Sequence, residues 1–103
     1  MKEDLLKIIN HYGINKQLKY IHSEYYELDE AIIQREYPAI AKDHKPYELM
    51  EFEKAHITEE IADVMVMLKQ FQYYYNISDE QIEKIMKQKI ERQLKRIESE
   101  NNE

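Results

Sequence analysis

The scarcity of turn-forming residues is the feature that most constrains how this chain folds. Its 103 residues include one glycine and two prolines, so few positions favour a break in regular structure. Charged residues make up 35% of the chain, and good helix formers dominate its composition. We therefore expect an all-α fold, a helical bundle of about four helices in a single domain spanning residues 1–103.

Residues that favour helix ends locate the first two expected helices. The first covers about 3–12 and ends at Gly13, which enters a left-handed cap at no steric cost. Asn15 is the expected N-cap of a second helix that runs to about Glu36. Pro38 disfavours helical geometry in the residue before it, and we expect it to break this helix.

Residues 37–47 form the one substantial loop that the sequence predicts. Pro46 suits the start of the third helix, expected over about 47–75, because its missing N–H needs no partner in a first helical turn. Asn76 can cap the end of that helix.

Ser78 followed by Gln81 is a capping-box pattern that predicts a fourth helix over about 79–98, with a frayed tail at 98–103. Apolar residues recur at helical spacing in the last three segments and define their expected core stripes. These stripes are Leu18, Ile21, Tyr25, Leu28 and Ile32; Ile57, Ile61, Val64, Leu68 and Phe71; and Ile82, Ile85, Met86, Ile90, Leu94 and Ile97.

Two acidic pairs carry the chemistry that the sequence predicts. Glu24 and Glu27 fall in the second expected helix. Glu60 and Asp63 fall in the third, and each pair is spaced i,i+3 on one helix face. The first member of each pair lies about 60–70° from the centre of its apolar stripe and the second about 120–130°, in the same rotational sense. Because helices joined by a short connection pack antiparallel, we expect an antiparallel central hairpin with all four carboxylates along one side, beside its core.

Carboxylates brought this close repel one another unless a cation neutralises them. Hard oxygen ligands suit Mg²⁺ or Mn²⁺, which bridge protein carboxylates to substrate phosphates, so the pattern favours a metal-dependent enzyme acting on a phosphorylated substrate. A solvated acidic face is the alternative, because the chain has 21 acidic residues and other pairs share the spacing: Glu27/Glu30, Glu48/Glu51 and Glu80/Glu83. A di-iron site needs Glu-x-x-His on two helices, and only Glu53/His56 has that spacing.

Charge and composition narrow the function classes further. The net charge of −6 disfavours non-specific nucleic-acid binding, and the absence of cysteine excludes disulfides and thiolate ligands. No Gly-rich phosphate loop is present, which excludes P-loop and Rossmann chemistry at the level of motifs. The chain has no long apolar run and starts with charged residues, so we expect a cytoplasmic protein that does not enter a membrane.

The two acidic motifs resemble those of the all-α nucleoside triphosphate pyrophosphohydrolase superfamily, the MazG-like proteins. Their signature is Glu-x-x-Glu on one helix and Glu-x-x-Asp on the next. Glu24-Tyr25-Tyr26-Glu27-Leu28 matches the first half and Glu59-Glu60-Ile61-Ala62-Asp63-Val64 the second. The run Lys89-Ile90-Glu91-Arg92-Gln93-Leu94-Lys95-Arg96-Ile97 resembles the basic segment that follows in many members, and the resemblance spans roughly 14–97.

The resemblance implies hydrolysis of a nucleoside triphosphate to the monophosphate and pyrophosphate, by a homo-oligomer of two or four chains. It implies Mg²⁺ held by the four carboxylates, and it makes Lys89 and Arg92 candidates for contacting substrate phosphates; a solvated basic face is their alternative role. Gln17 and Tyr20 lie one turn before the first acidic pair and are candidates for a base pocket. The competing functional interpretation is a non-catalytic helical oligomerisation or adaptor module, or a degenerate member that binds nucleotide without turnover.

Overall fold

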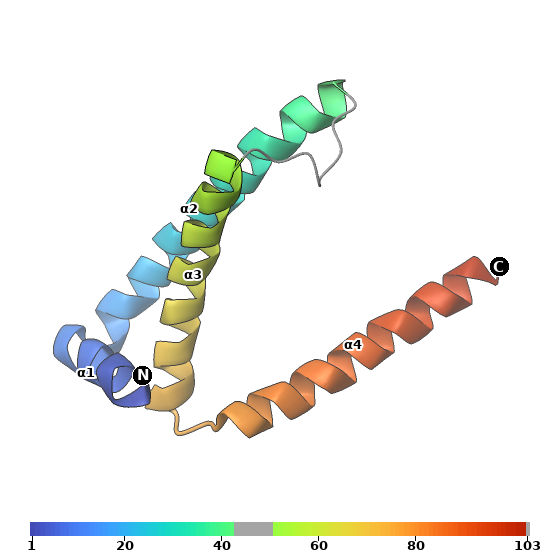
Figure 1. Cartoon of the computed structure of the whole chain (residues 1–103). Coiled ribbons are helices and arrows are strands. Elements are labelled where there is room, and N and C mark those ends of the chain that lie inside the picture. The colour runs from blue at the N-terminus through green and yellow to red at the C-terminus, as the bar shows by residue number, and fades with distance from the viewer. Residues whose placement is uncertain (43–50, 103) are drawn as a thin grey trace.

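The computed structural model describes residues 1–42 and 51–102, and this part of the chain is all-helical, without strands. It confirms the predicted all-α fold class with its four helices. Three of them pack together, whereas the fourth projects away (Figure 1). The helices are α1 (Lys2–Tyr12), α2 (Ile14–Lys42), α3 (Glu51–Tyr74) and α4 (Asp79–Asn101).

The turn between α1 and α2 consists of a single glycine. Gly13 has φ +90°, a region that L side chains rarely adopt, and its N–H donates to the carbonyl of Ile9 at 2.8 Å. This confirms the predicted end of the first helix. The prediction that Asn15 caps the second helix is wrong, because α2 already begins at Ile14 and Asn15 lies inside its first turn.

α2 continues through Pro38 to Lys42, so the predicted break at Glu36 is also wrong. A proline inside a helix removes one backbone hydrogen bond, but its fixed φ is itself close to the helical value. The neighbouring Ala39 and Ala41 are among the strongest helix formers, which favours continuation past the missing bond. The remainder of the predicted loop, 43–47, and the predicted helix start at Pro46 lie outside the described residues.

The end of α3 is fixed by Asn76, as the sequence predicts. Asn76 adopts φ +57°, and its N–H donates to the carbonyl of Tyr73 at 3.0 Å. The N–H of Ile77 donates to the carbonyl of Gln72 at 3.0 Å. Together these two bonds form a Schellman motif, which satisfies carbonyls that the last helical turn leaves without partners.

The start of α4 confirms the predicted capping box. The Ser78 hydroxyl accepts from the Gln81 N–H at 3.1 Å, and the Gln81 side chain accepts from the Ser78 N–H at 2.9 Å. The predicted end at about residue 98 is early, because α4 remains helical to Asn101. No glycine or proline interrupts this segment, so nothing in the sequence forces an earlier end.

α2 and α3 form the antiparallel hairpin at the centre of the fold (Figure 1). The Gln17 amide donates to the Gln70 amide oxygen at 2.8 Å at one end of the seam, and Arg35 lies 3.5 Å from the Glu53 carboxylate at the other. The two helices are therefore antiparallel and in register: residues further along α2 face residues equally far back toward the N-terminus of α3. The seam residues, all buried or half-buried, recur at alternating spacings of three and four: Gln17, Ile21, Glu24, Leu28, Ala31 and Arg35 on α2, and Glu53, Ile57, Glu60, Val64, Met67 and Phe71 on α3.

The apolar stripe predicted for the second helix is only partly the packed face. Leu18, Tyr25 and Ile32 are 46%, 63% and 41% exposed. The seam on α2 is rotated by about one residue, roughly 100°, from these three positions. The helices therefore pack through a partly polar face and leave an apolar face outside. α1 completes this unit by burying Leu5 and Ile9 against α2 and α3.

The first residue of α4 is hydrogen-bonded to α3, but no side chain of α4 is buried. The Asp79 carboxylate accepts hydrogen bonds from Lys69 at 2.6 Å, Gln72 at 2.8 Å and Tyr73 at 2.9 Å. These bonds, with that of Lys69 the largest, lower the pKa of Asp79 to about 2. Among the described residues, no helix is long and apolar enough to cross a membrane.

Candidate metal centre

The four predicted carboxylates meet on the central hairpin. Glu24 and Glu27 come from α2, and Glu60 and Asp63 come from α3. One oxygen from each residue can be chosen so that all four atoms lie within 4.8 Å of one another. The antiparallel register produces this arrangement, because each i,i+3 pair faces its counterpart at the same height of the hairpin.

Burial divides the acidic cluster into an inner and an outer pair. Glu24 and Glu60 occupy seam positions and are half-buried, whereas Glu27 and Asp63 are exposed at the rim. The sequence predicted that all four would lie beside the core; the structure instead places one residue from each helix within the seam. Packing therefore restrains the inner carboxylates, while the outer pair opens toward solvent.

The electrostatics of the cluster favour a bound cation. The pKa of Glu24 is raised above its ordinary value of 4.5, first by burial and then by the negative charges of Glu27, Asp63 and Glu60. One buried oxygen on Glu24 and one on Glu60, Oε2 in each case, have no hydrogen-bond partner in the described structure. Ion pairs within the described residues do not involve any of the four carboxylates. Buried oxygens without partners and mutually repelling charges are both relieved by a metal ion.

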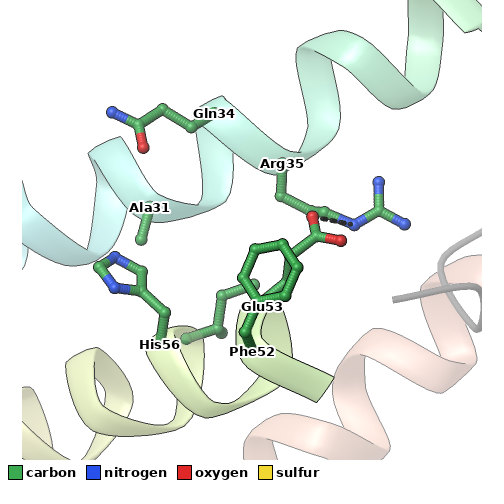
Figure 2. Close-up of a pocket in the computed structure, with 7 residues that line it drawn as sticks. Ala31, Gln34, Arg35, Phe52, Glu53 and His56 are labelled. Atoms are coloured by element: carbon green, nitrogen blue, oxygen red, sulfur yellow. Dashed lines mark ion pairs between the residues drawn. The ribbon is translucent and has the colours of Figure 1, made fainter. Parts of the chain in front are cut away.

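A cavity of about 410 Å³ lies between α2 and α3, toward the C-terminal end of α2 (Figure 2). Its lining residues are Ala31, Gln34 and Arg35 from α2 and Phe52, Glu53, His56 and Ile57 from α3. A smaller hollow of about 220 Å³ shares Ala31, Gln34 and His56 with it and also touches Glu27 and Glu60. The cavity and the acidic cluster are therefore neighbouring parts of one surface.

Sequence reasoning missed this cavity. Glu53 and His56 drew notice only for their spacing, and no local pattern connects Arg35 with a partner 18 positions further along the chain. The helical spacing of Ala31 and Gln34 after Glu27 was the available signal, because it places them on the same side of α2 as that carboxylate.

The residues predicted to form a base pocket lie on the other side of the acidic cluster along α2. Gln17 is 3% exposed and its amide bonds to Gln70, so it is part of the core. Tyr20 is 47% exposed and lines a separate hollow of about 230 Å³ with Lys16, Lys19 and Ser23. Neither Gln17 nor Tyr20 lines the 410 Å³ cavity.

The predicted phosphate contacts lie on α4. Lys89 and Arg92 are both exposed. Since α4 diverges from the hairpin, the chain does not bring these two side chains to its own carboxylates (Figure 1). For Lys89 and Arg92 to contact a phosphate held at an acidic cluster, α4 would have to pack against another chain.

Comparison with known proteins identifies no relative. No family model, no curated protein and no solved structure matches this chain. The resemblance to MazG-like proteins therefore rests on the sequence motifs alone.

Proposed function

We propose that this chain is a Mg²⁺-dependent nucleoside triphosphate pyrophosphohydrolase. The observation that carries the proposal is the convergence of four carboxylates from two antiparallel helices, with oxygens within 4.8 Å of one another. The two acidic motifs supply the reaction class through their resemblance to MazG-like proteins. The proposed products are a nucleoside monophosphate and pyrophosphate.

The carboxylates fit Mg²⁺ by their chemistry and by their different exposure. Mg²⁺ prefers oxygen ligands and commonly joins a few carboxylates to waters and substrate phosphates; Mn²⁺ accepts similar ligands. Glu24 and Glu60 offer buried oxygens that lack partners. Glu27 and Asp63 lie at the open rim, where a triphosphate can approach.

In the proposed reaction, a water oxygen attacks the α-phosphorus and the bond from that phosphorus to the α–β bridging oxygen breaks. The metal, when bound, supplies charge neutralisation for the phosphates and acidifies the attacking water. A carboxylate of the four that does not bind the metal would orient the attacking water and accept its proton. Glu60 occupies a packed seam position, so its carboxylate is held at the inner edge of the site.

We further propose that the protein acts as a homo-oligomer, with α4 at an interface. Five large apolar side chains of α4 are between 48% and 59% exposed: Ile85, Met86, Ile90, Leu94 and Ile97. Most helices in proteins are stabilised by burying such a face, and α4 buries no residue against its own chain. A second copy would cover this stripe, and Lys89 and Arg92 could then approach the carboxylates of another subunit.

A non-catalytic oligomerisation module is the second candidate, and the exposed apolar face of α4 favours it. The two functions differ in the part played by the carboxylates. An oligomerisation module requires α4 but not the charge of Glu60. The proposed enzyme requires α4 and also the charge of Glu60.

Pyrophosphate release from ribo- and deoxynucleoside triphosphates, in Mg²⁺ and in EDTA, tests the enzyme. We expect metal-dependent release together with an equal amount of monophosphate. Glu60→Gln and Asp63→Asn should abolish release while the helical signal in circular dichroism is retained. Glu59→Gln is the matched control, because Glu59 is exposed and lies outside the acidic cluster. Absence of release from every nucleotide, with Mg²⁺ or Mn²⁺, would favour the oligomerisation module.

A further inference from the structure

The cavity of about 410 Å³ has the position of a substrate subsite beside the proposed metal centre. It connects to the acidic cluster through Ala31, Gln34 and His56, which also line the hollow that touches Glu27 and Glu60. A molecule held at the carboxylates can therefore extend along the hairpin into the cavity. The volume falls within the range of small-molecule sites and is sufficient for a base and its sugar.

The walls of the cavity suit an aromatic ring. Phe52 is 71% exposed, and its ring and that of His56 extend from α3 toward α2 (Figure 2). Ala31 is buried at the facing position on α2, where its single methyl group leaves space between the helices. A nucleobase can stack on an exposed phenyl ring beside an open cavity, and any of the bases can do so because each has a flat aromatic face.

The polar groups of the cavity suit an uncharged ligand. Arg35 and Glu53 approach to 3.5 Å and form an ion pair at one end, so their charges compensate each other (Figure 2). Gln34 contributes an exposed amide with both donors and an acceptor, which is the equipment needed to bind the edge of a base. This end of the surface therefore has little net attraction for a phosphate.

Basic residues lie on the opposite side of the acidic cluster. Lys16 and Lys19 line a hollow of about 230 Å³ together with Tyr20 and Ser23. Lys16, Tyr20 and Ser23 precede Glu27 at helical spacing and so share its stripe of α2. A ligand centred on the carboxylates thus has lysines toward one end and a charge-compensated, ring-lined cavity toward the other.

We propose that this cavity binds the base and sugar of a nucleotide, with Phe52 stacking on the base and Gln34 contacting its edge. The assignment rests on the proposed function for the location of the phosphates, which face the side of Lys16 and Lys19. It defines the substrate as a nucleoside polyphosphate, in contrast to an inorganic polyphosphate, and it places base selection between α2 and α3.

Two pairs of variants test the cavity. Phe52→Ala removes the ring at an exposed position, and Phe52→Tyr retains it. Ala31→Leu fills the cavity, whereas Ala55→Leu makes the same change at an exposed position of α3 outside it. Calorimetric titration in Mg²⁺ measures the Kd of each variant for a nucleoside monophosphate and for inorganic pyrophosphate, and circular dichroism verifies the fold.

We expect Phe52→Ala to weaken monophosphate binding by about 5- to 150-fold, the range of base–aromatic stacking. Ala31→Leu should weaken it as well, and Phe52→Tyr and Ala55→Leu should remain close to the parent chain. Pyrophosphate binding should be the same in all four variants, because its contacts lie at the carboxylates. Unchanged monophosphate affinity in Phe52→Ala, or an equal loss of pyrophosphate affinity, would overturn the assignment of the cavity.

The same measurements separate this inference from the proposed function. If the parent chain hydrolyses nucleotides and Phe52→Ala binds the monophosphate normally, the proposed function stands and the cavity assignment fails. If the parent binds the monophosphate through Phe52 but hydrolyses no triphosphate, the cavity assignment stands and the enzyme proposal fails. If the parent binds no nucleotide, both fail.

Discussion

Removal of one inner carboxylate should change the stability of this protein in opposite directions with and without Mg²⁺. Glu60→Gln preserves the size of a half-buried seam side chain and removes its negative charge. In the metal-free protein the substitution removes repulsion from Glu24, Glu27 and Asp63. In Mg²⁺ it removes a proposed ligand, so the parent chain should gain stability that the variant does not.

The magnitude follows from the separations in the cluster. Two unit charges at the outer limit of 4.8 Å repel by about 0.9 kcal/mol in bulk water. Salt near physiological strength reduces each interaction to about half of this value. Three such interactions disappear in Glu60→Gln, which predicts a gain of about 1.5 kcal/mol in the metal-free free energy of unfolding. The parent chain gains about 2.7 kcal/mol when Mg²⁺ is present at a hundred times its Kd, so the order of stability reverses.

Chemical denaturation followed by circular dichroism, in EDTA and over a series of Mg²⁺ concentrations, measures both effects. Glu59→Gln is the control for each, because it removes the same charge from an adjacent exposed position. The reasoning is refuted if Glu60→Gln and Glu59→Gln have equal free energies of unfolding in EDTA and respond equally to Mg²⁺. That result would mean that the carboxylates neither repel measurably nor share a cation.

Four further predictions follow from other parts of the molecule. Because folding raises the pKa of Glu24, its contribution to metal-free stability is fully present below its ordinary pKa of 4.5 and is lost as pH rises through the raised value; Glu24→Gln should remove this dependence in thermal melts. Asp79 has a lowered pKa of about 2 against 3.8 unfolded, so its stabilisation is present above 3.8 and lost as pH falls through about 2; Asp79→Asn should flatten melts measured across pH 2–5. Gln70→Leu should destabilise the fold by about 1–3 kcal/mol because it leaves the buried Gln17 amide without its partner, and Gln17→Leu in the same chain should restore much of the loss on denaturation. Ile90→Glu should lower the mass measured by light scattering if α4 forms the oligomer interface, whereas an unchanged mass would place that interface elsewhere.

Local signals in the sequence correctly predicted the end of α1, the end of α3 and the start of α4, because each signal depends on residues a few positions apart. Gly13, Asn76 and Ser78 act through their own backbone geometry or through one short hydrogen bond. The prediction at Pro38 failed because the preference of proline for helix ends is also local, and a local preference can be overridden by the rest of the helix. The structure retains the helix at that point despite the missing bond.

The packed seam was less predictable, because the sequence shows which faces are apolar but not which partner each face contacts. Apolar periodicity favoured Leu18, Tyr25 and Ile32, whereas the hairpin packs through the adjacent face that includes Gln17 and Arg35. Gln17 has its hydrogen-bond partner, and Arg35 its ion-pair partner, on the other helix. The four carboxylates nevertheless meet, because the two motifs lie at corresponding heights and a rotation of both helices keeps them facing each other.

The polar seam and the outward apolar faces are two consequences of one arrangement. Packing α2 on α3 through a seam that includes charged and amide groups places carboxylates where backbone geometry restrains them, and it leaves large apolar side chains on α2 and α3 exposed to solvent. Two features of this hairpin are unfavourable in the isolated chain: the inner carboxylates repel one another, and the outer apolar side chains are exposed to water. A cation relieves the first and a second copy relieves the second under the functional proposal. Metal binding and association should therefore both stabilise the fold, and their effects on unfolding can be separated with Glu60→Gln and Ile90→Glu, which act on different surfaces.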